Sequence, residues 1–243
     1  LIGGAIAVWY MFFAARQLRP IRLKWSRRSL LYSVRNIGYQ CTIGLSALMG
    51  ECTMAVLALV GNYVFGTYMG DAGIGAFGIA CYYTPFVFMI GNAVAQSAQP
   101  IVSFNYGSGD SSRVHSTLRV ALLAALGCGA TVSAAFVLLP RELVELFIVS
   151  SEAAFPLAVK GFPLIALSFV FFIVNLTCIG YFQSIERVRP AMIFALLRGL
   201  LLLVPSFVVM PMAFGDTGIW LALAVSEMLT TACIVGYMTI RTS

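Results

Sequence analysis

Six long, continuous apolar runs are the feature of this sequence that most limits its fold. They span residues 41–68, 73–102, 117–139, 157–183, 190–213 and 217–240. Each run is long enough for an α-helix to cross a bilayer, because about 20 apolar residues cover roughly 30 Å of hydrocarbon. The strands of a membrane β-barrel are shorter and alternate apolar with polar side chains. The runs therefore predict an all-α membrane protein with six transmembrane helices.

Composition supports the membrane class and excludes a soluble domain. Hydrophobic residues make up 60% of the 243 residues and charged residues only 10%, whereas soluble domains carry about 25% charged residues. The six cysteines lie in apolar runs without paired spacing, so neither a disulfide framework nor a metal site is expected. No catalytic combination of histidine, serine or paired aspartate occurs in the spans, so we expect neither an enzyme nor a cofactor.

Basic residues are concentrated on one side of the expected helices. Six of the fifteen lie within residues 16–28. Alternating the spans from there puts twelve on one side and two on the other, with Arg198 inside a span. Short cytoplasmic loops carry such an excess of Lys and Arg. We therefore expect a multi-pass protein of the bacterial inner membrane with a cytoplasmic carboxy terminus. The net charge of +6 then reflects contact with the lipid surface, and nucleic acid is not an expected partner.

The two ends of the chain differ in character. Residues 1–15 look like the end of a transmembrane helix, and they lack the features of a signal peptide. We therefore expect a chain that begins within a longer membrane protein. Residues 16–38 should form a basic cytoplasmic linker and the start of a helix, and residues 39–243 a six-helix transmembrane lobe. The longest connection within the lobe, 140–156, should contain a short helix at the membrane interface.

Glu51 is the acidic side chain that the membrane constrains most. At 1.5 Å per residue from Cys41 it lies roughly 15 Å deep, where a charge costs about 2.5–3.5 kcal/mol. No basic residue lies three or four positions away on the same helix. Protonation, a bound cation, a water-filled cavity or Arg198 from another helix would offset the cost. A coupling site for H⁺ or Na⁺ and a structural Glu51–Arg198 pair both remain open.

Arg198 and Glu227 are charged residues within the last two spans. They lie about 12 Å and 15 Å along helices that follow one another in the sequence. A structural ion pair between them is therefore expected, because a lone buried charge is costly. Such a pair would leave Glu51 without a partner and favour the ion site.

Three amides share one face of the second span. Asn92, Gln96 and Gln99 are spaced by four and three residues, which is helical spacing. Amides that face lipid would lack hydrogen-bond partners, at several kcal/mol each. They must therefore either bond to other helices or line a substrate cavity. A second polar set in the 157–183 span is Asn175, Thr177, Tyr181 and Gln183, of which Asn175 and Thr177 could meet Glu51 across that cavity.

Three segments of the sequence resemble motifs of the multidrug and toxic compound extrusion (MATE) family. They are QPIVSFNYG at 99–107, YFQSI at 181–185 with RPA at 189–191, and GIWLA at 218–222 with Glu227. The resemblance implies helices 7–12 of a twelve-helix antiporter, preceded by the tail of helix 6. It also implies export of organic cations or related amphiphiles in exchange for Na⁺ or H⁺, with an amino-terminal lobe as the missing partner.

The resemblance also implies roles for individual residues. Glu51 lies where one branch of the family places a cation-binding glutamate in helix seven. That branch also uses an aspartate in helix ten, where this chain has only Asn175 and Thr177. Asn92, Gln96 and Gln99, here called the amide stripe, and Tyr181 would belong to the substrate cavity. Alternatives are a flippase or small-metabolite exporter of the same superfamily, and a half-lobe that needs a partner chain.

Overall fold

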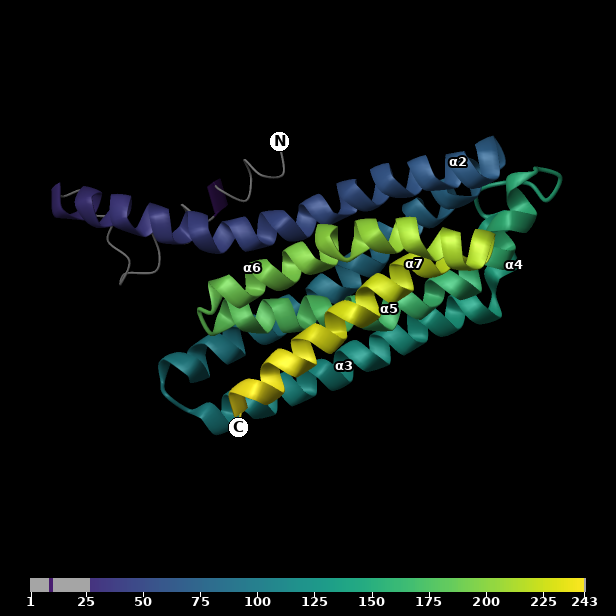
Figure 1. The fold of residues 1–243 in the computed structure, drawn as a ribbon. Coiled ribbons are helices and arrows are strands. Elements are labelled where there is room, and N and C mark those ends of the chain that lie inside the picture. Colours follow the sequence, from purple (N-terminus) through teal and green to yellow (C-terminus); the bar gives the residue numbers. More distant parts are fainter. Residues whose placement is uncertain (1–8, 11–26, 243) are drawn as a thin grey trace. The chain divides into compact units, whose positions relative to one another are not determined.

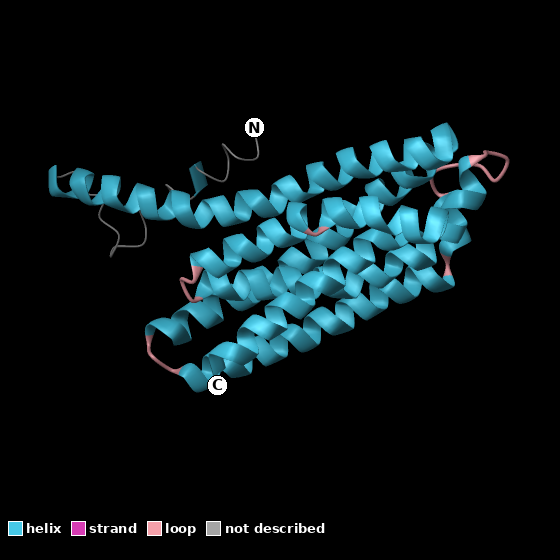
Figure 2. Ribbon diagram, viewed as in Figure 1, coloured by secondary structure: helices cyan, strands magenta, loops and turns pink. Residues whose placement is uncertain are grey.

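The computed structural model describes residues 9–10 and 27–242. The chain divides into two units, residues 1–42 and residues 43–243, and the contacts and pockets described below all lie in the second unit. The expectations for residues 1–8 and 11–26 lie outside the described residues. Throughout the described part the secondary structure is helical, with turns between the helices (Figure 2).

The helices follow one another with short connections (Figure 1). They are α2 (Arg27–Gly107), α3 (Ser111–Leu138), α4 (Pro140–Glu145), α5 (Ala154–Ser184), α6 (Val188–Leu196) and α7 (Leu203–Thr242), with a π-helical turn η1 (Leu197–Leu201) before α7. Four continuous helical stretches of the described chain are long and apolar enough to cross a membrane: 51–107, 111–138, 154–184 and 188–240.

Helix α2 is two antiparallel helices joined at Gly70. Gly70 has a φ of +64°, a left-handed conformation that glycine adopts without strain. Contacts on either side of it show that the chain reverses, since the rings of Phe65 and Phe77 stack with centroids 4.6 Å apart. A Cβ on Gly61 would overlap Phe77 as well. We call residues 43–69 the first arm of α2 and residues 71–107 its second arm.

A second reversal divides α7. Gly215 has a φ of +57°, and the carbonyl of Met210 lies so close to Gly218 that a Cβ there would overlap it. The four long stretches thus contain six antiparallel segments, which begin and end near the six predicted spans. The structure confirms the all-α membrane fold of the sequence prediction.

Helix α5 is the central helix of the lobe. It packs against α3, α4, α6 and α7, and most of its side chains are buried. Its aromatic side chains join neighbouring helices: the ring of Phe169 meets that of Phe136 on α3 edge-to-face at 4.9 Å. The short helix α4 confirms the helix predicted in the 140–156 connection, and Tyr83 of the second arm donates a hydrogen bond to the Leu143 carbonyl at 2.9 Å. Its position at the membrane interface stays a prediction.

Helices α3 and α5 approach closely at Gly129, so a larger side chain there should destabilise the protein. A Cβ on Gly129 would lie 2.7 Å from the Cα of Val170, and a backbone atom cannot move aside cheaply. We expect Gly129→Ala to lower the free energy of unfolding by about 1–3 kcal/mol, as overpacking usually does. Chemical unfolding of the purified protein in detergent measures the change.

Gly127, two residues earlier on α3, is the matched control. A Cβ there would meet no atom within 4 Å. Gly127→Ala should therefore leave stability unchanged or raise it by up to about 1 kcal/mol, the difference in helix propensity between the two residues. Equal losses in both variants would contradict the packing described here.

Candidate substrate and ion cavity

A polar cavity of about 370 Å³ lies between both arms of α2, α5, α6 and the π-turn η1. Its polar lining residues are Glu51, Thr53, Asn92, Gln96, Gln99, Gln183 and Arg198. The first arm of α2 contributes Glu51, the second arm contributes the amide stripe, and η1 contributes Arg198. Segments far apart in the sequence thus bring their polar groups into one space.

The amide stripe faces this cavity. Asn92, Gln96 and Gln99 all line it, as their spacing predicted. Gln99 also donates a hydrogen bond to the Gln183 side chain on α5, with a donor–acceptor distance of 3.3 Å. Within the described residues, no hydrogen bond joins the side chain of Asn92 or Gln96 to another protein group. Gln99 thus links the second arm of α2 to α5. The amides of Asn92 and Gln96 are available to a bound molecule.

Glu51 borders the cavity without an ion pair in the described part of the chain. Its side chain is exposed in this structure. The structural Glu51–Arg198 pair, one of the two possibilities left open by the sequence, is not formed. Among the described residues that line this cavity, Glu51 is the only one with a carboxylate.

Arg198 is paired with Glu227 instead. Its Nε lies 2.8 Å from Glu227 Oε1, and both side chains are 1% exposed. This contact confirms the ion pair predicted between the last two spans. Asn175 completes the environment of the carboxylate, because its Nδ2 donates to Glu227 Oε2 at 2.7 Å. Thr231 in turn donates to Asn175 Oδ1 at 2.8 Å. Thr231 was not among the residues predicted from the sequence, although it lies one turn from Glu227 on the same helix.

The expectation that Asn175 and Thr177 would meet Glu51 is wrong in this structure. Asn175 is 0% exposed. It faces α7, where its side-chain amide donates a hydrogen bond to Glu227. Thr177 is buried and donates to the backbone carbonyl of Ile173 at 2.9 Å. Neither residue lines the cavity. The face of α5 that does so is offset around the helix, and its members are Leu176, Ile179, Gly180 and Gln183.

Tyr181 also lies away from this cavity. It lines a different pocket at the end of α5, together with Tyr106 and Tyr237. It follows Gly180, which lines the cavity, but successive residues of a helix point about 100° apart. The placement of Tyr181 in the substrate cavity is therefore corrected.

The π-turn η1 brings Arg198 to the cavity. The N–H of Leu202 donates to the Leu197 carbonyl at 2.8 Å, five residues back, and such turns locally widen a helix and recur at functional sites. Gly199 follows Arg198, and a Cβ there would overlap Thr53. Only a residue without a side chain lets η1 approach the first arm of α2 so closely.

The Arg198 guanidinium also lies on an aromatic ring. Its Cζ is 3.8 Å from the centroid of the Phe172 ring, a cation–π contact that stabilises a desolvated cation. Its Nη2 has no hydrogen-bond partner within the described structure. A salt bridge, a ring face and an amide thus hold a buried charge pair at the wall of the cavity.

A six-segment helical lobe with a polar cavity inside the membrane-spanning region is the architecture of a membrane transporter. Comparison with known proteins identifies the transporter family. The MatE family model matches residues 47–208, which is more than half of the chain. This chain belongs to the MATE family.

Relatives and solved structures agree with this membership. The chain is 28% identical over 239 residues to the probable multidrug resistance protein NorM of Rhizobium meliloti (strain 1021), covering 90% of this chain and 48% of the relative. It thus spans about half the length of that relative. The fold is similar to that of the MATE transporter VcmN from Vibrio cholerae, with a TM-score of 0.84 at 15% identity over 99% of this chain and 54% of that one.

A third similar fold is a MOP superfamily transporter from Pyrococcus furiosus. The TM-score is 0.75 at 16% identity, and the match covers 82% of this chain and 45% of that one. These structures support the lobe architecture. The roles of the individual cavity residues do not follow from them.

Proposed function

We propose that the chain acts as the carboxy-terminal lobe of a multidrug transporter that exports organic cations in exchange for Na⁺ or H⁺. The observation that carries the proposal is the carboxylate of Glu51, which lines a polar cavity and forms no ion pair with any residue that the structure describes. Arg198, the other charged group of that lining, is already neutralised by Glu227. An ionisable side chain in a membrane span without a partner is the usual mark of an ion or substrate pathway.

The cavity has suitable chemistry for exchange. Glu51 attracts either a small cation or an organic cation, and both compete for the same negative charge. Asn92 and Gln96 offer donors and acceptors that can follow different molecules, and Phe88 adds an aromatic surface. The volume of about 370 Å³ lies at the lower end of the range for small-molecule sites, about 300–1,000 Å³. Occupation by ion and by substrate in turn is the proposed basis of antiport.

Membership of a transporter family places the chain in a membrane as a multi-pass protein. We propose the bacterial inner membrane, with the carboxy terminus on the cytoplasmic side, from the distribution of Lys and Arg. We also propose that an amino-terminal lobe supplies the other wall of the transport pathway. The coverage of 48% of the NorM relative supports this second lobe.

A second candidate is a flippase or small-metabolite exporter that recognises an anionic group. The position of Arg198 at the cavity wall, with Nη2 unpaired, favours it. The similar transporter from Pyrococcus furiosus is described as having a binding pocket of reversed polarity. The ion pair with Glu227 argues against it here, because the charge of Arg198 is already compensated.

Transport in liposomes tests the proposal. We expect the intact protein to export a cationic dye when an inward gradient of Na⁺ or of H⁺ is imposed, and the effective gradient identifies the coupling ion. Dye fluorescence inside the vesicles measures the rate. A labelled-lipid flipping assay on the same preparation tests the second candidate. Lipid flipping without gradient-driven dye export would contradict multidrug antiport.

A further inference from the structure

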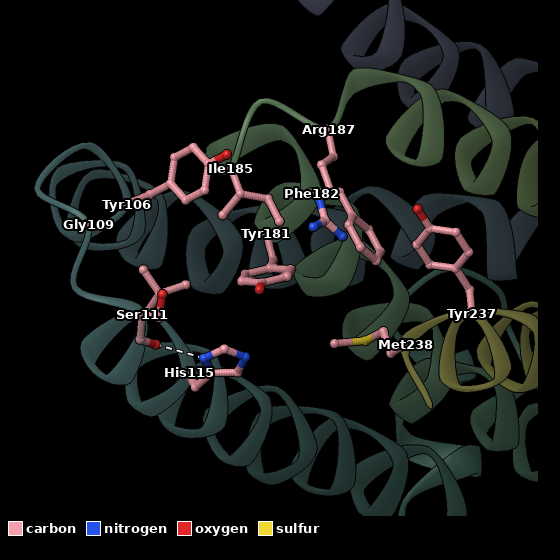
Figure 3. A pocket seen from close by; sticks show the side chains of 11 residues that line it. Tyr106, Gly109, Ser111, His115, Tyr181, Phe182, Ile185, Arg187, Tyr237 and Met238 are labelled. Atoms are coloured by element: carbon pink, nitrogen blue, oxygen red, sulfur yellow. Dashed lines mark hydrogen bonds between the residues drawn. The ribbon is translucent and has the colours of Figure 1, made fainter. Parts of the chain in front are cut away.

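A second pocket, of about 410 Å³, shares no lining residue with the cavity described above. Figure 3 shows its side chains arranged around an open space. The lining residues are Tyr106, Gly109, Ser111, Val114, His115, Tyr181, Phe182, Ile185, Arg187, Tyr237 and Met238. They come from four helices or the turns beside them, so the fold itself builds the pocket.

The pocket lies where helices end. α2 ends at Gly107 and α3 begins at Ser111, while α5 ends at Ser184 just before Arg187. In a membrane protein the ends of spanning helices lie at the level of the lipid head groups. We therefore expect the pocket to lie at the level of the lipid phosphate groups.

The charge of the pocket is positive. Among the described residues that line it, Arg187 is the one Arg or Lys, and none is Asp or Glu. Arg187 is exposed and forms no ion pair within the described chain. Asp110 lies in the adjoining turn, but its carboxylate caps α3 by accepting a hydrogen bond from the Arg113 N–H at 3.0 Å. A guanidinium without a carboxylate partner is a strong site for an anion.

Besides Arg187, the pocket is lined by hydroxyl groups and an imidazole ring. Tyr106, Tyr181 and Ser111 each place a hydroxyl in the lining (Figure 3). His115 Nδ1 lies 2.7 Å from the Ser111 carbonyl. Because that oxygen can only accept, Nδ1 carries the proton and donates, and Nε2 is left for other contacts.

Another part of the lining is apolar. Val114, Phe182, Ile185 and Met238 supply it, and the ring of Phe182 packs edge-to-face against Tyr181 with centroids 5.6 Å apart. A cation beside an apolar wall suits a ligand with an anionic head and an apolar body. Basic pockets between membrane helices bind lipid head groups in this way.

We propose that this pocket binds the phosphate group of an anionic amphiphile, with Arg187 as the residue that holds the charge. The phosphate oxygens accept hydrogen bonds from the guanidinium and from the tyrosine hydroxyls, and the apolar body lies against Phe182 and Ile185. The chemistry is shared by the head group of an anionic phospholipid and by a free phosphate ester. This site does not depend on the transport function proposed above.

Native mass spectrometry of the purified intact protein tests the proposal. Phosphatidylglycerol, phosphatidylcholine and glycerol 3-phosphate are added separately, and the fraction of protein with one bound molecule is measured. We expect bound phosphatidylglycerol to exceed bound phosphatidylcholine, and Arg187→Gln to weaken that binding at least about tenfold, as loss of a charge-assisted hydrogen bond does.

Arg189→Gln is the matched control. Arg189 is exposed two residues further on, carries the same charge and does not line the pocket. Its variant should bind phosphatidylglycerol as the unchanged protein does. Arg187-dependent binding of glycerol 3-phosphate alone would support the phosphate site and assign it to a soluble ester. Equal binding by the Arg187 and Arg189 variants, or no binding of either phosphate compound, would overturn the proposal.

Discussion

Glu51→Gln is expected to abolish ion-driven efflux while the protein is still made and inserted. Glutamine keeps the size and hydrogen-bonding shape of the side chain but holds neither a proton nor a negative charge. Glu51 is exposed to the cavity and pairs with no basic side chain of the described structure, so folding does not depend on its charge. We expect gradient-driven dye export to fall at least about tenfold, because an intramembrane carboxylate of this kind carries the coupling charge.

Glu152→Gln provides the control for this prediction. Glu152 is an exposed carboxylate in the connection between α4 and α5, and it does not line the cavity. Its variant should export dye at the unchanged rate. Export by Glu51→Gln at the rate of the control, with equal amounts of protein in the membrane, would defeat the assignment of Glu51.

The largest expected effect on stability comes from Arg198→Met. Removing the guanidinium leaves the Glu227 carboxylate at 1% exposure with only the amide of Asn175 as a charge-stabilising partner. An uncompensated buried charge costs about 3–5 kcal/mol. The free energy of unfolding should fall by this amount, measured by chemical unfolding of the purified protein in detergent.

The double variant Arg198→Met with Glu227→Gln shows how much of the lost stability comes from the uncompensated charge of Glu227 and how much from the lost packing of Arg198. Neutralising both partners removes the buried charge, so the double variant should regain much of the stability lost in the single one. Arg113→Met is the surface comparison, since its pair with Asp110 is 3.4 Å long and exposed. Such pairs contribute at most about 1 kcal/mol. A double variant no more stable than Arg198→Met would contradict a compensating pair.

The membrane-spanning segments could be predicted from the sequence because bilayer thickness fixes their length. The apolar runs 41–68 and 73–102 become the two arms of α2, and the reversal falls at Gly70 between them. The face shared by Asn92, Gln96 and Gln99 was also predictable, because helical periodicity is a local property. The partner of Arg198 followed from the cost of a lone buried charge.

The direction in which α5 presents its polar residues could not be predicted. Asn175 and Thr177 lie within α5 and are buried, but Asn175 points at Glu227 on α7. Tyr181 reaches the pocket at the end of the helix. Which helix lies against which face is set by tertiary packing, and the spacing of residues along one span carries no information about its neighbours. The closeness of Gly199 to Thr53 is a packing contact of the same kind.

Equilibrium binding of a cationic dye to the purified intact protein, titrated with Na⁺ and separately with H⁺, tests the central assignment most directly. Dye and coupling ion should compete for Glu51, so dye affinity should fall as one of the two ions is raised, and Glu51→Gln should remove that dependence. Ion-dependent dye binding that persists unchanged in Glu51→Gln would show that the exchange takes place at another residue.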